Sequence, residues 1–278
     1  MRFGLLVQMT GSLGYAQPLV RLAREAEAAG WDGFFIWDVF GGASDQPTAV
    51  VDPWVALTAI AAATERIRFG PMVTPLPRRR PWKLAREAAS LDHLSGGRLI
   101  LGVGIGTPPE EFARFGEEPD PRIRAEMLDE GLEVLTGLWS GEPFSFQGRH
   151  YQVNEATLLP RPIQQPRIPI WVGGTWPRKP SFRRAARWDG VFPGGLQGNL
   201  TLDEIREMVG FIQSQRPSSE PFDVMVGGDV PFDDPDRARA ILAEYAAAGV
   251  TWWMEGVGEW CGDVDAMATF IRGGPPGR

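Results

Sequence analysis

One junction recurs along this sequence and restricts what the chain can fold into. A helix-like, Ala-rich stretch ends at a glycine or polar turn, and a short β-branched or aromatic run follows at once. In one example, Glu27-Ala28-Ala29-Gly30 leads through a turn into Phe34-Phe35-Ile36-Trp37. Glycine suits the position after a helix because the left-handed conformation found there costs it little. Such junctions are typical of repeated βα units.

The repeat predicts eight strands, each followed by a helix. The predicted strands are Phe3–Met9, Phe34–Trp37, Ile67–Phe69, Arg98–Leu101, Ile168–Val172, Val191–Phe192, Phe222–Val226 and Val250–Met254. Eight βα units favour an α/β fold, the (β/α)8 TIM barrel. A chain of 278 residues has the length of one such barrel, so we expect a single domain over residues 1–278 with a frayed tail from about residue 273.

Long irregular stretches interrupt this pattern at 38–52, 104–121, 140–167 and 193–200. All but 140–167 begin directly after a predicted strand. Loops in that position meet at the C-terminal face of a barrel, where ligands bind. The sequence therefore predicts a barrel with insertions in the loops of its C-terminal face.

Charge and composition exclude several classes of protein. The 28 Lys and Arg against 35 Asp and Glu give a net charge of −7, which makes nucleic acid a poor partner. No apolar run reaches the roughly 18 residues of a membrane span, and the chain starts as a strand, so we expect a cytoplasmic protein with no membrane partner. One cysteine and two histidines cannot form a zinc site of the usual spacing, so no metal is predicted.

Two predicted strands run into glycines. After Arg98–Leu101 come Gly102, Gly104 and Gly106, where the backbone could approach a flat or phosphorylated ligand, although tight barrel packing would also explain them. After Ile168–Val172, Gly173-Gly174-Thr175 leads into a helix and could bind an anion. The alternative there is an ordinary turn whose basic residues form a solvated face; these are Arg178, Lys179, Arg183 and Arg184.

Three carboxylates follow or end predicted strands. Asp38 closes the second strand, so its carboxylate should face the barrel mouth; the alternative is that it caps the loop 39–46. Asp229 and Glu255 end the seventh and eighth strands and support the same argument more weakly. A barrel hydrolase with Asp38 and Glu255 as an acid/base pair is therefore one reading. Residues expected in structural roles are His93, His150, Trp37, Trp171, Trp252 and Trp253.

Several motifs resemble the bacterial luciferase-like flavin-dependent oxidoreductases. They are Pro75-Leu76-Pro77 with Arg78–Arg80, Leu91-Asp92-His93-Leu94-Ser95-Gly96-Gly97-Arg98 running on to Gly106, Glu111-Phe112, Gly137-Leu138-Trp139-Ser140-Gly141, and Pro160-Arg161-Pro162 running on to Gly174. The resemblance covers residues 3–195 closely. It implies a (β/α)8 barrel that binds FMN or the deazaflavin F420 at the C-terminal face.

The resemblance also implies positions for the cofactor. Its ring would lie near Trp37, Asp38, Val73, Thr74, Gly104, Ile105 and Gly106, and its phosphate near Gly173, Gly174, Thr175, Lys179 and Ser181. Members often carry a non-prolyl cis peptide or bulge, which would fall near Val73-Thr74. Many relatives that oxidise alcohols with F420 have Asp-His where this chain has Asp38-Val39. Valine cannot transfer a proton, so alcohol oxidation with that histidine as the base is not expected here.

The function implied is an oxidoreductase in which a reduced flavin-type cofactor serves hydride transfer or O2-dependent monooxygenation of a small organic substrate, with Asp38 as the catalytic residue. The alternatives are a non-catalytic flavin-binding relative and the hydrolase. The resemblance also allows a separate flavin reductase as a partner. Residues 54–60 and 82–85 hold more apolar surface than one inward stripe requires, so a homodimer is predicted.

Overall fold

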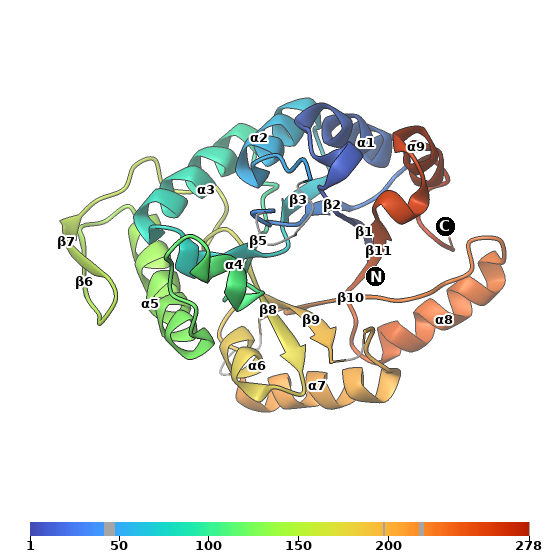
Figure 1. Cartoon of the computed structure of the whole chain (residues 1–278). Helices are drawn as coiled ribbons and strands as arrows, with labels where there is room; N and C mark the ends of the chain where they lie inside the picture. Colours follow the sequence, from blue (N-terminus) through green and yellow to red (C-terminus); the bar gives the residue numbers. More distant parts are fainter. Residues whose placement is uncertain (42–47, 197, 217–219, 278) are drawn as a thin grey trace.

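The computed structural model describes residues 1–41, 48–196, 198–216 and 220–277. Nine parallel strands form a nearly closed barrel inside a ring of helices (Figure 1). The strands are β1 (Arg2–Val7), β2 (Gly33–Ile36), β3 (Arg68–Pro71), β4 (Thr74–Pro75), β5 (Leu101–Gly104), β8 (Ile170–Trp176), β9 (Gly190–Gly195), β10 (Asp223–Gly227) and β11 (Trp252–Val257). β4 is a two-residue strand beside the end of β5, and the other eight are the strands of the predicted TIM barrel. The predicted fold is confirmed.

The strands follow chain order around the barrel, and β1 lies between β2 and β11. The ring closes between β3 and β5, where Phe69 and Leu99 form an isolated parallel bridge. There the Ile100 N–H donates to the Phe69 carbonyl at 2.9 Å. All strands therefore end at one face, which brings distant segments of the chain together.

A helix follows each of the eight main strands. These helices are α1 (Ala16–Ala28), α2 (Pro53–Ala63), α3 (Pro81–Ser95), α5 (Pro121–Trp139), α6 (Lys179–Ala185), α7 (Leu202–Gln215), α8 (Pro235–Ala247) and α9 (Val264–Arg272). Local sequence explains where several begin. Asp52, Asp120 and Asp234 each accept a hydrogen bond from a backbone N–H of the first turn, and each is followed by a proline. A carboxylate cap and a proline at the first helical position both favour a helix start.

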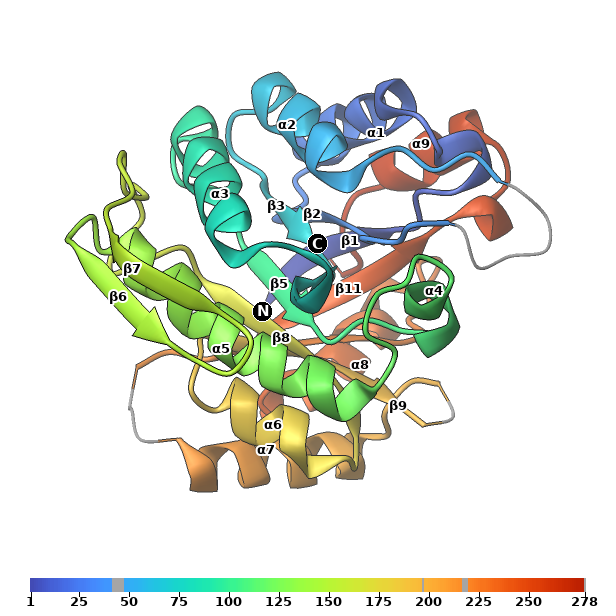
Figure 2. The same ribbon diagram turned by 60° about the vertical axis from the view of Figure 1, so that its left-hand side comes forward.

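Short elements fill the insertions. At or after strand ends lie η1 (Gly11–Leu13), η2 (Leu76–Arg78), α4 (Pro109–Ala113) and η3 (Glu259–Cys261), and between α5 and β8 lies the hairpin of β6 (Phe144–Gln147) and β7 (Gln152–Ala156). The hairpin lies outside α5 in both Figure 1 and Figure 2. Glu130 of α5 accepts backbone hydrogen bonds from Arg149, His150 and Tyr151 at its turn. This insertion follows a helix, so it lies away from the C-terminal face.

The inside of the barrel is filled by aromatic side chains. Phe35, Trp171 and Trp252 contact one another, with ring centroids 5.4–5.7 Å apart. Met72, Ile100, Met225 and Met254 complete this inner core, while a larger core lies between the strands and the helices. The inner core closes the barrel below its mouth, so it is a packed interior rather than a pore.

Two predictions about segments are wrong. The fourth strand lies at Leu101–Gly104 rather than Arg98–Leu101, because its glycines belong to the sheet: a Cβ at Gly102 would lie 2.2 Å from the Pro71 carbonyl oxygen. The tail predicted to fray instead has Gly274, Pro275 and Pro276 buried. Its proline rings pack against the protein, and Arg239 of α8 donates to the Gly277 carbonyl at 3.5 Å. No helix in the described ranges has the length and hydropathy needed to cross a bilayer.

Candidate functional site

Val73 and two glycines, one at the end of β5 and one in the middle of β8, form a cradle. A non-prolyl cis peptide joins Met72 to Val73, next to the position that the resemblance implied. A Cβ at Gly104 would lie 2.8 Å from Val73 Cγ2, and one at Gly173 would lie 3.2 Å from Val73 Cγ1. Only glycine allows Val73 to lie this close to both strands. The structure therefore brings Val73, Gly104 and Gly173 together above the inner core, with Gly104 buried and the other two half-buried.

The remaining residues predicted near the ring differ in how they are placed. Gly106 has a φ of 80°, and a Cβ there would lie 2.3 Å from Phe112 Cζ, so this turn requires glycine. Ile105 and Trp37 are half-buried and pack against the larger core between the strands and the helices. Thr74 is fully buried, and its hydroxyl is bonded to Asp38. The Thr74 hydroxyl is therefore engaged inside the protein.

Asp38 is held by two side chains. Thr74 Oγ1 donates to Asp38 Oδ2 at 2.6 Å, and Arg79 Nη2 donates to Oδ2 at 2.9 Å and to Oδ1 at 3.2 Å. Burial raises the pKa of Asp38 above its ordinary value, against the opposing effects of the Arg79 charge and the Thr74 hydroxyl. Both carboxylate oxygens are thus engaged. Most of the loop that Asp38 was alternatively expected to cap, residues 42–46, lies outside the described residues.

The end of β8 and the start of α6 hold the residues predicted for the phosphate. A Cβ at Gly174 would lie 2.6 Å from Ser181 Cβ, so these two residues are in contact. The Arg178 N–H donates to the Thr175 carbonyl at 2.9 Å and closes the turn before α6. Lys179 is exposed, and its ammonium lies 5.3 Å from the ring centroid of Phe211 on α7. The strand residue Gly174 therefore meets Ser181 of α6, with Thr175 next to it along β8, and the Lys179 ammonium lies against α7.

The solvated basic face expected on α6 is wrong for one residue. Arg184 is buried, and its Nε and Nη2 donate to the two carboxylate oxygens of Asp129 on α5, both at 2.7 Å. Because Asp129 supplies a matched acceptor for the planar guanidinium, Arg184 links α6 to α5.

A stack of charged and aromatic groups behind Gly106 was missed. The ring of Phe112 contacts two guanidinium groups, with its centroid 4.1 Å from Arg78 Cζ and 3.8 Å from Arg124 Cζ. Arg78 also pairs with the buried Glu111 at 2.9 Å. Arg124 is 1% exposed, and its Nε and Nη1 have no hydrogen-bond partner. Arg78 and Phe112 belong to motifs quoted above, whereas nothing local in the sequence marks Arg124.

A cavity of about 430 Å3 lies on the other side of the mouth; we call it the mouth cavity. It is lined by Leu6, Phe192, Pro193, Gly194, Gly198, Asn199, Leu200, Val226, Gly227, Gly228, Asp229, Met254, Glu255, Gly256 and Trp260. These residues lie in or just after β1, β9, β10 and β11. The cradle and the mouth cavity thus lie on different strands of the same C-terminal face.

Glu255 is a buried carboxylate at this cavity. Trp253 Nε1 donates to Glu255 Oε1 at 2.5 Å. Burial raises the pKa of Glu255 to about 7, with the Trp253 hydrogen bond opposing and the nearby Asp229 adding to the rise. Side chains alternate along a strand, so Glu255 and Trp253 face the helices while Met254 faces the inner core. Glu255 therefore does not point along the barrel axis toward Asp38, as the hydrolase reading requires.

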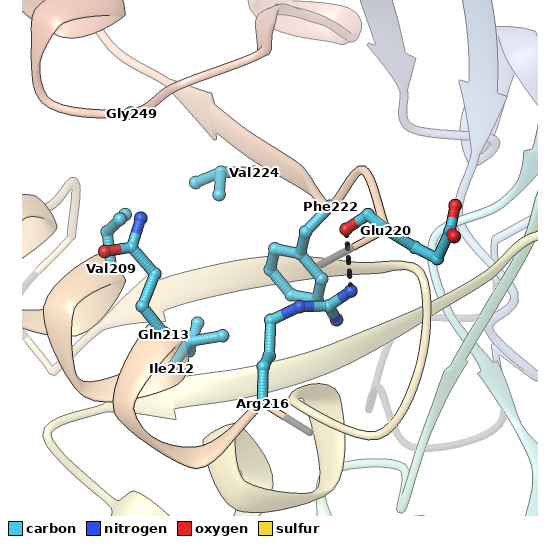
Figure 3. A pocket seen from close by; sticks show the side chains of 8 residues that line it. All are labelled: Val209, Ile212, Gln213, Arg216, Glu220, Phe222, Val224 and Gly249. Atoms are coloured by element: carbon cyan, nitrogen blue, oxygen red, sulfur yellow. Dashed lines mark hydrogen bonds between the residues drawn. The ribbon is translucent and has the colours of Figure 1, made fainter. Parts of the chain in front are cut away.

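A second cavity, of about 380 Å3, lies at the opposite end of the barrel (Figure 3). It is lined by Val209, Ile212, Gln213, Arg216, Glu220, Phe222, Val224 and Gly249, from the end of α7, the start of β10 and the turn after α8. Arg216 donates to the carbonyls of Glu220 at 3.0 Å and Trp188 at 2.8 Å. Its guanidinium thus joins chain segments at the base of the barrel, away from the ligand-binding face.

The chain has clear relatives. A family model described as luciferase-like monooxygenase matches residues 1–270. An uncharacterized protein of Mycobacterium tuberculosis is 33% identical over 242 residues, which are 81% of this chain and 80% of that protein.

Two solved structures share the fold over almost their full length. An F420-dependent secondary alcohol dehydrogenase in complex with an F420–acetone adduct superposes with a TM-score of 0.80 at 17% identity, covering 100% of this chain and 99% of the other. The oxygenating constituent of 3,6-diketocamphane monooxygenase from Pseudomonas putida, in complex with FMN, gives a TM-score of 0.75 at 17% identity, covering 98% and 96%.

Proposed function

Because the chain belongs to the luciferase-like monooxygenase family, we propose that it is an oxidoreductase that binds a reduced flavin-type cofactor, F420 or FMN, at the C-terminal face of its barrel. When bound, such a cofactor supplies a hydride or activates O2. The observation that carries the proposal is the cradle, where Gly104 and Gly173 leave room for the Val73 side chain after the non-prolyl cis peptide. The names of the two similar structures, which include F420 and FMN, support these two cofactors.

The residues of the chain would bind and orient the cofactor. The half-buried Val73 and Gly173 of the cradle would lie against a flat ring. Gly174 and Thr175 at the end of β8, with Ser181 at the start of α6, would offer backbone N–H groups and a hydroxyl to a phosphate. Asp38, predicted as the catalytic residue, has both oxygens engaged. We therefore propose that Asp38 acts by holding Thr74, and with it the adjacent Val73, in position.

Cofactor titration tests this function. Oxidised and reduced FMN and F420 are titrated separately while fluorescence is recorded, and saturable binding of at least one form is expected. Gly174→Val should abolish that binding, because a larger side chain there would collide with Ser181. Absence of binding by both cofactors in both redox states would overturn the proposal.

A turnover assay distinguishes an oxidoreductase from a non-catalytic protein that only binds the cofactor. The loaded, reduced protein is mixed with O2 and with a panel of uncharged ketones and aldehydes, and cofactor reoxidation is followed; the loaded, oxidised protein is mixed with uncharged alcohols, and cofactor reduction is followed. An oxidoreductase reoxidises the cofactor faster than free cofactor does in the same buffer. Tight binding without any such acceleration would identify a non-catalytic flavin-binding relative instead.

A further inference from the structure

The walls of the mouth cavity are apolar over about half of their surface and polar over the other half. Leu6, Leu200, Val226 and Met254 contribute aliphatic side chains, and several glycines contribute bare backbone. Phe192 is half-buried on one wall. At the rim, the indole of Trp260 is 64% exposed. A volume of about 430 Å3 falls in the range of pockets that bind small organic molecules.

The acidic and basic side chains around the barrel mouth lie on different sides of it. Asp229 and Glu255 are the ionisable residues that line the cavity in the part of the chain that the structure describes, and both are acidic. The arginines of the mouth are elsewhere: Arg78 and Arg79 follow β4, and Arg124 lies in the first turns of α5. The Glu255 carboxylate is turned toward Trp253. An anion in the cavity would thus meet the Asp229 carboxylate, and no cation lines the cavity among the described residues, so the anion would be repelled.

We propose that the mouth cavity is the substrate subsite, and that it takes an uncharged organic molecule with an apolar body and rejects carboxylates and phosphate esters. This inference rests on the proposed function, because it assigns the substrate class of that same site. The half of the mouth with the cradle and the arginines suits a cofactor with an anionic phosphate. The acidic, aromatic half suits a neutral substrate that lies beside it.

Three probes with one ring and different charge test the inference. Cyclohexanone, cyclohexylammonium and cyclohexanecarboxylate are titrated into the protein, with and without saturating cofactor, and Kd values are obtained by saturation-transfer NMR. We expect cyclohexanone to bind at least about tenfold more tightly than cyclohexanecarboxylate. Equal or tighter binding of the carboxylate, or no binding of any probe, would overturn the proposal.

Variants locate the binding. Trp260→Ala should weaken cyclohexanone binding by roughly three- to tenfold, because an aromatic wall is lost. Asp229→Asn should reduce the ratio of the carboxylate Kd to the cyclohexanone Kd, because it removes the carboxylate that repels an anion. The matched control is Trp82→Ala, which removes a partly exposed tryptophan on α3, outside the cavity. If Trp82→Ala weakens the probes as much as Trp260→Ala does, the subsite lies elsewhere.

The titrations test the proposed function and the proposed substrate class independently. Since the probes are also titrated into the cofactor-free protein, their binding is measured whether or not FMN or F420 binds. Failure of both cofactors with the expected order of probes would overturn the proposed function and leave the chemistry of the cavity supported. Cofactor binding with a preference for the carboxylate would overturn the substrate class alone.

Discussion

The buried pair of Asp38 and Arg79 shows what one residue contributes to this site. Asp38→Asn keeps the shape of the side chain but leaves the Arg79 guanidinium without its countercharge. We expect the free energy of unfolding to fall by about 1.5–3 kcal/mol, as for charged hydrogen bonds inside proteins. Urea denaturation measures this change. Arg80→Gln, at the exposed neighbouring arginine, is the control and should change stability by less than about 0.5 kcal/mol.

Cofactor affinity then shows whether Asp38 positions the cradle. If it does, Asp38→Asn weakens cofactor binding by at least about tenfold at temperatures where the variant remains folded. A destabilised variant with unchanged affinity would give Asp38 a purely structural role.

Glu255 predicts a pH dependence of stability. Its pKa is about 7 in the folded protein, against an ordinary value of 4.5. Between these two values the folded state binds more protons than the unfolded state, so the free energy of unfolding falls as pH rises through this window. The loss is on the order of 3 kcal/mol and is complete above about pH 7.

Urea denaturation of the native protein and of Glu255→Gln, at about pH 5 and about pH 8, measures this effect. Glutamine does not titrate, so the difference in stability between the two proteins should change with pH in favour of the variant. The same difference at both pH values would contradict the prediction, since all other groups are common to both proteins.

For single residues, the sequence predicts which positions belong to the site better than it predicts which side chains contact one another. The cradle glycines and Val73 could be named, because they lie in motifs whose positions are fixed by neighbouring residues. The bonds from Thr74 and Arg79 to Asp38 could not, because these residues are 36 and 41 positions away and meet only in the folded barrel. The outward direction of Glu255 depends on strand register, which the sequence leaves open.

At the scale of elements, the repeated junction predicts which strands and helices exist, while tertiary contacts decide where they end. Glycines are poor strand formers, so local propensity places Gly102–Gly104 in a loop. In the barrel those glycines continue β5, because Pro71 and Val73 lie too close for any larger residue. The short η2 and α4 elements have no comparable repeat, which is why the stack of Arg78, Phe112 and Arg124 could not be predicted.

Two glycine substitutions test the role of β5. Gly104→Ala places a Cβ 2.8 Å from Val73 Cγ2, so Val73 has to move, and cofactor affinity should fall by at least about tenfold. In Gly210→Ala on α7 the new Cβ meets no atom within 4 Å. That control should stabilise the helix by about 0.5–1 kcal/mol and leave cofactor affinity unchanged. Equal affinity in both variants would place the ring elsewhere.

At the scale of the whole molecule, we propose that the protein is a homodimer. Most of the apolar residues in 54–60 and 82–85 are buried within the chain, so the predicted surplus surface shrinks to Val55 and Trp82. Leu94, at the other end of α3, is also exposed. Together they leave apolar groups on the adjacent helices α2 and α3.

Light scattering should therefore give twice the mass of the 30.6 kDa chain at micromolar concentration. Trp82→Glu with Leu94→Glu should produce monomers, because a dimer would have to bury the two new charges. Tyr15→Glu, at an exposed ring before α1, is the matched control. A native protein with the mass of one chain would contradict the proposal.

The aromatic inner core has a consequence for how ligands come and go. Phe35, Trp171 and Trp252 fill the barrel below its mouth. In the part of the chain that the structure describes, ligands can therefore enter the barrel only from its C-terminal face. Cofactor and substrate would then enter through the same face, and the molecule that lies nearer to solvent would have to leave first. A single molecule that joins a flat ring to a neutral apolar group through a short tether would occupy the cradle and the mouth cavity at once.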